Sequence, residues 1–233
     1  MKNLVLVVLL LLSGQTDTDE LQKLFHNFNV QSIDASIVQV IAETGKETQR
    51  YEGRYRAYND CMRIDYSKPF RQIVIVNGGK LLWYYPETKE LWTMSQGNVP
   101  AVHPYAQCDI VNERIVVKSK KKVWYGFFNS GYRYTLFDSK TGVTLELTID
   151  KDKGYPVKKI TYTAQSIEVM RELYSDYTLI QGIWFPATVE VIARTHTGTT
   201  RNVTRYYNII LNGNVSTDIF TLQLPKGVRA KTM

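Results

Sequence analysis

The chain has 233 residues, of which 44% are hydrophobic and 22% are charged, a balance typical of a globular protein and not of a disordered one. This length allows one large all-β domain or two small ones. A formal net charge of +7 fits nucleic acid, anionic lipid or an acidic partner, and the export signal at the N-terminus excludes nucleic acid.

The first 16 residues are predicted to be a signal peptide. A basic Lys2 precedes an unbroken apolar run over residues 4–12, and the small residues Ser13 and Gly14 follow it. This order of a charged, an apolar and a small-residue segment is typical of secretory signals. The apolar run is too short for a membrane anchor, because a helix that spans a bilayer needs about 20 residues.

Residue 15 is informative about anchoring. Residues 12–14 resemble the approach to a bacterial lipoprotein cleavage site, where the next residue is the cysteine that receives the lipid, but here that residue is Gln15. Without a thiol no lipid anchor can form, and cleavage after Gly14 or Thr16 is compatible with the pattern. We therefore expect a soluble exported chain, 17–233, that forms a single domain.

The clearest helix pattern covers residues 18–29. Leu21, Leu24, Phe25 and Phe28 lie at spacings that place all four on one helical face. Such an amphipathic helix is expected to lie against a sheet. A structural role in the core and a role as part of a lid both fit the pattern.

Strand patterns follow roughly every 8–12 residues, which is the spacing of a sandwich or a barrel. Tyr and Trp are abundant, with 16 and 4 copies, and both pack well on a pleated surface. Asn77-Gly78-Gly79 predicts a tight hairpin turn, because these residues tolerate positive φ. The expected strands are 32–42, 49–58, 64–66, 70–76, 80–85, 91–94, 132–137, 143–150, 157–163, 167–177, 183–194 and 199–211.

Residues 95–122 are expected to be the irregular middle of the chain. Pro100 and Pro104 discourage regular strands, and 109–118 fits either a short helix or a strand. Lys118, Lys120, Lys121 and Lys122 form a basic run inside this stretch. Such a run is typical of a solvated loop or of an edge strand, where lysine prevents pairing with another sheet.

The two cysteines, Cys61 and Cys108, would enter an oxidising compartment, where a disulfide is chemically reasonable. Closing the loop between them would contribute about 4 kcal/mol in the chain-entropy model. Two buried free thiols are equally compatible with the sequence.

The stretch 63–86 carries a family resemblance. An arginine-containing strand, Arg63-Ile64-Asp65-Tyr66, leads to a proline, an apolar strand, an Asn-Gly-Gly-Lys turn and a Leu-Trp-Tyr-Tyr strand. This order resembles the periplasmic lipoprotein carrier family, LolA. Further motifs in the same order as in that family are Phe137-Asp138, 145–150, Tyr155-Pro156, 174–177, 182–186 and 220–225.

The resemblance implies a fold and a function. The fold would be mainly β, an antiparallel half-open β-barrel covered by the N-terminal helix and a helical or loop lid. The function would be that of a soluble, monomeric periplasmic carrier that binds lipoprotein acyl chains and delivers lipoproteins to the outer membrane. An inner-membrane lipoprotein-releasing transporter and an outer-membrane acceptor are the implied partners. The alternative is a lipid- or lipoprotein-sensing module of the same fold that binds an anti-sigma factor.

The chain departs from the family at 58–60. Many carriers have a basic residue and a proline just before the aromatic-rich strand, whereas this chain has Tyr58-Asn59-Asp60. We therefore assign no release role to this segment.

No catalytic pattern stands out. The three histidines are far apart in the sequence and none has metal-ligand spacing, and the Gly-x-Ser-x-Gly elbow of lipases is missing. We expect a binding protein without cofactor or metal, and not an enzyme, although an enzyme acting on lipid or glycan is a third hypothesis.

The candidate binding residues are apolar, because burial of each CH₂ of an acyl chain contributes about 0.8 kcal/mol and needs no reacting group. They lie on the predicted helix and on strands of both halves of the chain. A filled core and a ligand cavity would both use such residues. The set is Leu21, Leu24, Phe28, Met62, Ile64, Trp83, Tyr85, Leu145 and Leu147.

Overall fold

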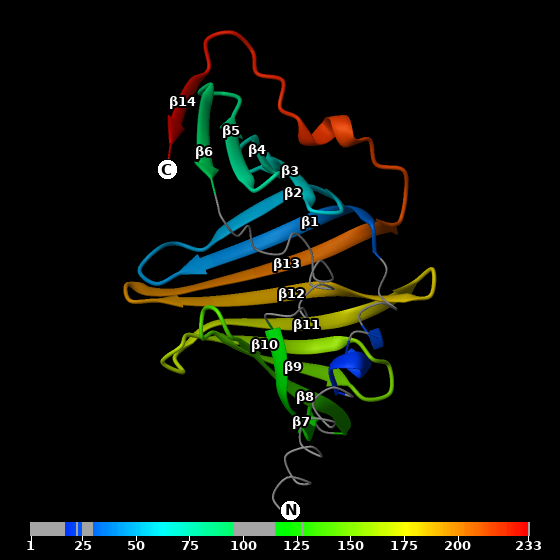
Figure 1. Ribbon diagram of the computed structural model, residues 1–233. Helices are drawn as coiled ribbons and strands as arrows, with labels where there is room; N and C mark the ends of the chain where they lie inside the picture. Colours follow the sequence, from blue (N-terminus) through cyan, green and yellow to red (C-terminus); the bar gives the residue numbers. More distant parts are fainter. Residues whose placement is uncertain (1–16, 22, 25–29, 96–114, 127, 233) are drawn as a thin grey trace, which may run out of the picture.

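The computed structural model describes residues 17–21, 23–24, 30–95, 115–126 and 128–232. All fourteen described strands belong to one sheet, in the order β14-β6-β5-β4-β3-β2-β1-β13-β12-β11-β10-β9-β8-β7 (Figure 1). The strands are β1 (Ser32–Glu43), β2 (Gln49–Tyr58), β3 (Cys61–Lys68), β4 (Gln72–Asn77), β5 (Lys80–Tyr85), β6 (Glu90–Ser95), β7 (Ile115–Tyr125), β8 (Asn129–Asp138), β9 (Thr144–Asp150), β10 (Pro156–Tyr162), β11 (Glu168–Ile180), β12 (Ile183–Thr195), β13 (Gly198–Leu211) and β14 (Arg229–Thr232).

The sheet does not close, because its two edge strands, β14 and β7, do not pair with each other in the described part of the chain. In Figure 1 the upper strands β4 to β6 stand steeply above the nearly horizontal β1, β13 and β12. This change of direction is the accumulated twist expected of a long sheet. The result is a strongly bent open sheet, as expected for a half-open barrel.

The expectation of a purely antiparallel sheet is wrong at one edge. β14 pairs with β6 in parallel, with Ala230 opposite Leu91, whereas the other neighbouring strands are antiparallel. A parallel pair needs a long connection. Residues 212–228 form the last connection, which runs from the end of β13 in the middle of the sheet to β14 at its edge.

One face of the sheet carries the main core, and we call it the inner face. Ile33 and Ala35 of β1 pair with Ala57 and Tyr55 of β2, and all four side chains are at most 3% exposed. The same cluster continues to the far end of the sheet and to the N-terminal helix. Its buried members are Leu21, Val30, Ile33, Ala35, Ile37, Tyr55, Ala57, Tyr66, Val117, Tyr134, Leu136, Leu147, Ile149, Phe185 and Leu211.

The predicted N-terminal helix is present in the described residues 17–21 and 23–24, while 25–29 lie outside the described part. Leu21 is fully buried in the core cluster and Leu24 packs against it. Glu20 forms an ion pair with Lys120 of β7 and accepts a hydrogen bond of 3.3 Å from the Tyr134 hydroxyl. The helix thus lies on the inner face. Among the residues described, no helix has the length and apolarity to cross a membrane.

The opposite, outer face of β3 to β6 is covered by the end of the chain. A short 3₁₀ helix, η1 (Thr217–Phe220), contacts β3 and β4, and Asn77 Nδ2 donates to the Phe220 carbonyl at 3.3 Å. Phe220, Ile75 and Tyr84 are at most 5% exposed. This second small core explains why strands near a sheet edge are apolar on both faces.

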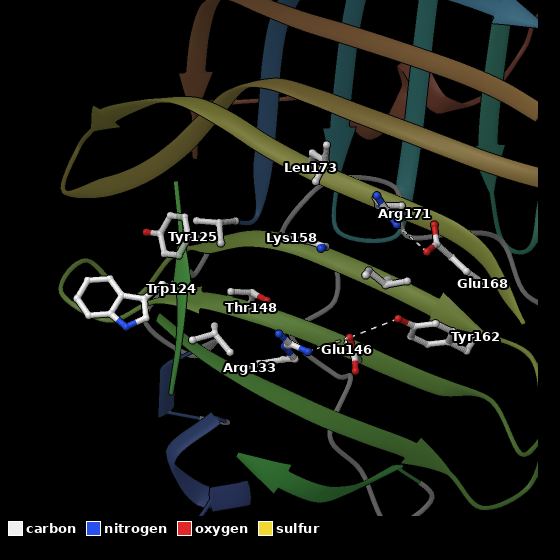
Figure 2. Close-up of a pocket in the computed structure, with 13 residues that line it drawn as sticks. Trp124, Tyr125, Arg133, Glu146, Thr148, Lys158, Tyr162, Glu168, Arg171 and Leu173 are labelled. Carbon is white, nitrogen blue, oxygen red and sulfur yellow. Dashed lines mark hydrogen bonds and ion pairs between the residues drawn. The ribbon is translucent and has the colours of Figure 1, made fainter. Parts of the chain in front are cut away.

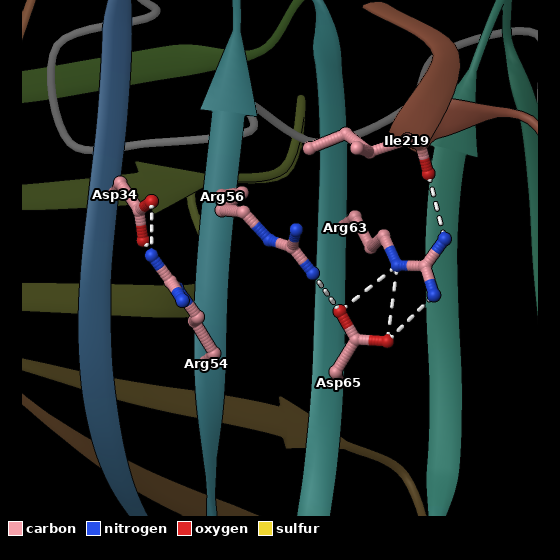
Figure 3. A network of polar contacts seen from close by, with 6 residues as sticks. All are labelled: Asp34, Arg54, Arg56, Arg63, Asp65 and Ile219. Carbon is pink, nitrogen blue, oxygen red and sulfur yellow. Dashed lines mark hydrogen bonds and ion pairs between the residues drawn. The ribbon is translucent and has the colours of Figure 1, made fainter. Parts of the chain in front are cut away.

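Arg63, the arginine of the 63–86 stretch, holds this cover in place (Figure 3). Its guanidinium donates to Asp65 at 2.7–3.0 Å and to the Ile219 carbonyl at 2.8 Å. Arg56 also pairs with Asp65. Partial burial alone would raise the pKa of Asp65, but hydrogen bonds and charge from Arg63 and Arg56 lower this pKa below its ordinary value.

Two local predictions have opposite outcomes. The Asn77-Gly78-Gly79 hairpin turn is confirmed, since Asn77 pairs with Lys80 and both glycines have positive φ, 55° and 72°. The expected irregular middle is wrong for residues 119–122, whereas the strand alternative is confirmed for 115–118, because Ile115–Tyr125 forms β7. Here the sheet-edge interpretation of the lysine run is confirmed, because β7 is an edge strand. A charged strand has a weak local pattern, and pairing with β8 decides its conformation.

Candidate functional site: the inner face of the sheet

The inner face brings together most of the predicted binding residues. Met62 and Ile64 of β3, Leu145 of β9 and Leu24 of the helix are partly buried against the same core that contains Leu147, which is 2% exposed. Leu21 completes the set from the helix. Leu147 therefore belongs to the close-packed part, and the partly buried members line its margin.

Trp83 and Tyr85 lie in an aromatic row on the inner face of the upper strands. Trp83 pairs with Val74 across β4 and β5, and its ring stacks on Tyr85 with a centroid distance of 5.8 Å. The row continues from Tyr85 to Phe70 at 6.2 Å and from Phe70 to Tyr51 at 6.4 Å. Phe70 is 43% exposed. The row therefore runs from the interior to solvent.

Three further contacts complete this row. Tyr51 lies 5.4 Å from Tyr66, ring centroid to ring centroid, and the Tyr66 hydroxyl donates to Gln39 Oε1 at 2.6 Å. The Trp83 indole donates to Gln72 Oε1 at 2.7 Å. The polar atoms of Tyr66 and Trp83 are thus hydrogen-bonded within the protein, and Phe70 offers the most exposed ring of the row.

The residues Tyr51, Tyr66 and Phe70 were not predicted. Each lies on a separate segment, and only the strand register places them together: Tyr66 pairs with Gly53, two residues from Tyr51. The signal that could have found them is the alternation of tyrosines in β2 and β3, once the two strands are aligned through their turn.

The middle of the inner face is dry and aromatic. Tyr206 makes edge-to-face contacts with Tyr55 at 5.6 Å and with Phe185 at 5.5 Å, a favourable geometry for aromatic pairs. Burial raises the pKa of both Tyr55 and Tyr206 far above the ordinary value. This region is a filled core that separates the two halves of the face.

A buried polar cluster marks the limit of the apolar surface. Lys159 of β10 and Glu172 of β11 form an ion pair of 2.5 Å, and Tyr174 donates to Glu172 at 2.5 Å. Lys159 is 7% and Glu172 is 9% exposed. Because buried charges require partners, this cluster is satisfied internally.

The structure does not test the predictions for Phe28, for the cysteine pair and for the lid. Phe28 and Cys108 lie outside the described residues. Cys61 is a half-buried thiol, whose Sγ lies 3.5 Å from Asn77 Oδ1. The disulfide between Cys61 and Cys108 and the lid over the inner face therefore stay predictions.

A second hollow, on the outer face of β8 to β11, has different chemistry (Figure 2). Its volume is about 490 Å³. Arg171 pairs with Glu168 at 2.7 Å, and Arg133 lies 3.7 Å from Glu146. Lys158 also lines it. Because this hollow is charged and its acidic and basic groups largely neutralise each other, it does not suit an acyl chain.

No group of three or more His, Cys, Asp or Glu residues that could hold a metal ion occurs in the described part of the chain. The arrangement on the inner face is suited to binding by apolar contact. Burial raises the pKa of Tyr66 and Tyr85 on this face, whereas for Lys120 the effect of burial is outweighed by Glu20 and Tyr134, which raise its pKa.

The sequence matches no protein-family model and no curated protein. Solved structures do match. A LolA superfamily protein from Nitrosomonas europaea, 15% identical, superimposes with a TM-score of 0.61 over 90% of this chain and 97% of its own. A DUF1329 family protein from Desulfovibrio piger, 14% identical, gives a TM-score of 0.65 over 89% and 97%.

A third similar structure is a domain from Vibrio parahaemolyticus described as an outer membrane lipoprotein-sorting protein. It is 11% identical and gives a TM-score of 0.60, covering 88% of this chain and 94% of that domain. The three structures together establish a LolA-like fold for this chain. The resemblance predicted from the 63–86 stretch is thereby confirmed at the level of the fold.

Proposed function

We propose that this protein is a carrier that holds lipoprotein acyl chains on the inner face of its open sheet and delivers lipoproteins to the outer membrane. The observation that carries the proposal is the set of partly buried apolar side chains at the margin of the core, which come from both halves of that face. Met62, Ile64, Leu145 and Leu24 of the helix belong to this set. The aromatic row ending at Phe70 extends this margin to solvent.

The affinity for an acyl chain would follow from the apolar area that it buries. Each CH₂ removed from water contributes about 0.8 kcal/mol, so a single long chain is held firmly and several chains would be held too tightly without a means of release. The site needs an element that can move at low cost in free energy.

The N-terminal helix fits this requirement. In the described residues, the polar contacts of the helix with the sheet are the Glu20–Lys120 ion pair and the hydrogen bond from the Tyr134 hydroxyl to Glu20. The Glu20 side chain is 45% exposed. An ion pair at this exposure contributes about 0–1 kcal/mol. Leu21 and Leu24 add apolar contact. Displacing the helix would open the apolar margin but would also expose Leu21, whose full burial contributes about 1.5–3 kcal/mol, so a bound acyl chain has to offset this cost.

The rest of the proposal concerns place and partners. The signal-peptide pattern and the absence of a cysteine at Gln15 favour release into the periplasm. A transporter in the inner membrane would load the carrier and an acceptor at the outer membrane would unload it, as in the family that the sequence resembles. The proposed role is binding and transfer, with no covalent step and no cofactor.

The test is a release assay. The purified mature chain is incubated with membranes that hold a tri-acylated lipoprotein, the releasing transporter and ATP. We expect the lipoprotein to leave the membrane in a soluble complex with the chain. If the lipoprotein stays in the membrane under these conditions, the carrier function is wrong. Capture of the periplasmic segment of an anti-sigma factor without lipoprotein release would favour the sensing alternative.

A matched pair of variants locates the site. Tyr85→Ala removes a ring from the aromatic row, whereas Tyr207→Ala removes a ring that is 47% exposed on the outer side of β13. We expect Tyr85→Ala to lower affinity for a fluorescent fatty acid severalfold and Tyr207→Ala to leave it unchanged. Equal effects would place the ligand elsewhere.

A further inference from the structure

The β7–β8 hairpin exposes the two largest solvent-facing aromatic side chains among the described residues. Trp124 is 71% exposed and Phe128 is 90% exposed. Figure 2 shows the Trp124 indole projecting away from the other side chains around the outer hollow. Single exposed apolar residues are normal on a protein surface, whereas apolar residues that gather in one patch mark an interaction site.

Basic residues surround these rings. Lys121 and Lys122 are exposed on the same hairpin, and Lys122 Nζ lies 5.7 Å from the centre of the Trp124 ring. The neighbouring β9–β10 turn is joined to the hairpin through Lys151 N, which donates to the Ser130 carbonyl at 3.1 Å. This turn adds exposed Lys151 and Lys153, together with one exposed carboxylate, Asp152.

The hairpin is held rigidly enough to present this surface. The Tyr125 hydroxyl donates to the buried carboxylate of Asp150, and Asp150 also accepts from the backbone N–H groups of Asp152 and Lys153 at 2.9 and 2.7 Å. The hairpin and the turn are therefore tied through one side chain. Aromatic and basic groups thus gather at one end of the strands, with Lys121 and Lys122 on opposite sides of β7, since they pair with Arg133 and Tyr132.

We propose that this hairpin surface, formed by Lys121, Lys122, Trp124, Phe128, Lys151 and Lys153, docks the protein on an anionic lipid bilayer. Trp is favoured at the boundary between headgroups and acyl chains, because its ring is apolar and its N–H is polar. Lysines beside it attract anionic headgroups within a Debye length. The four exposed lysines against one exposed carboxylate give the charge complementarity.

This inference goes beyond acyl-chain binding, since it concerns empty membranes and a surface away from the inner face. The test is flotation of the full mature chain with vesicles of phosphatidylcholine alone and with vesicles of equal parts phosphatidylcholine and phosphatidylglycerol. We expect binding to the anionic vesicles, weakened by salt, and little binding to the neutral ones. No binding to anionic vesicles at low salt, or equal binding to both kinds, would overturn the inference.

Matched variants separate this surface from general charge and hydrophobicity. Trp124→Ser with Phe128→Ser should weaken binding to anionic vesicles by roughly tenfold or more. The control, Tyr207→Ser with Ile210→Ser, removes side chains that are 47% and 53% exposed on β13, and it should bind like the parent chain. If both pairs weaken binding alike, the hairpin is not the docking surface.

Charge reversal gives a second, independent readout. Lys121→Glu with Lys122→Glu should weaken binding by more than tenfold, since each lysine near an anionic surface accounts for roughly fivefold. The control, Lys140→Glu with Lys226→Glu, reverses two lysines that are exposed elsewhere and should have a much smaller effect. Equal losses would indicate attraction by net charge alone.

Fatty-acid binding, measured on the same variants, keeps the two proposals apart. Hairpin variants should retain it, because Lys121, Lys122, Trp124 and Phe128 are exposed and belong neither to the core cluster nor to its margin. Loss of vesicle binding with retained fatty-acid binding supports docking. Loss of both in a folded variant would contradict a separate docking surface, while an absence of fatty-acid binding in the parent chain would count only against the carrier function.

Discussion

Truncation of Leu147 tests whether β9 contributes core or cavity. Leu147 is 2% exposed on the inner face, opposite Tyr134 of β8 and Lys159 of β10. Leu147→Ala removes three carbons, which corresponds to about 2.4 kcal/mol of lost transfer free energy at about 0.8 kcal/mol each. The void left behind brings the expected loss of unfolding free energy to about 2–5 kcal/mol.

Leu145 is the matched comparison, two residues away on the same face and only partly buried. Because part of its side chain already meets the open margin, Leu145→Ala should lower the free energy of unfolding by about 1 kcal/mol. It should also lower affinity for a fluorescent fatty acid. Urea unfolding followed by circular dichroism gives the stabilities, and fluorescence titration gives the affinity.

One result would refute this reasoning. If Leu145→Ala destabilises the protein as much as Leu147→Ala and leaves fatty-acid affinity unchanged, the margin at β9 is filled core. The binding site would then have to lie elsewhere on the sheet.

Three further predictions concern the polar ties. Glu20→Gln should lower the free energy of unfolding by about 0.5–1 kcal/mol and should increase hydrogen exchange at the start of the helix more than elsewhere. Arg63→Ala should cost about 1–3 kcal/mol in urea unfolding, because it frees Asp65 and the Ile219 carbonyl together; Arg54→Ala, at a side chain 60% exposed, should cost less than 1 kcal/mol, and equal losses would contradict the assigned role. The lowered pKa of Asp65 stabilises the fold above the unfolded-state pKa of about 3.9, and this contribution is lost as pH falls through the folded-state pKa; Asp65→Asn should therefore flatten the pH dependence of stability in the acid range, and an unchanged profile would argue against the shift.

Local sequence patterns were sufficient to predict the structure where a single chemical requirement dominates. The Asn77-Gly78-Gly79 turn needs positive φ at two successive residues, and glycine at both provides it. Leu147 and Ile149 on one side of β9 are buried, as their alternation with polar residues indicates, but Thr148 and Asp150 on the other side are buried as well, so the expected solvent-facing side is wrong. The order of motifs around Arg63 predicted the LolA-like fold, although the role of that arginine as a tie to the chain end was not foreseen.

Pairing between strands distant in the sequence was not predictable from local sequence patterns. β7 has no strong apolar alternation, since four lysines interrupt it, and its conformation depends on hydrogen bonds to β8. β14 is short and fully exposed, and it forms only because the chain returns along the outer face to reach β6. Neither pairing, β7 with β8 or β14 with β6, is indicated by the sequence of the strand itself.

The sequence by itself determined an aromatic-rich β protein with an amphipathic helix, because composition, apolar period and turn residues are local properties, while export stays a prediction. Only the tertiary structure decided which side chains share a face. Strand register joined Tyr51, Tyr66 and Phe70 to Trp83 and Tyr85, and it placed a charged pair beside the apolar margin. A shift of one residue in register would turn each of these side chains to the opposite face, and that register is set by pairing between strands distant in the chain.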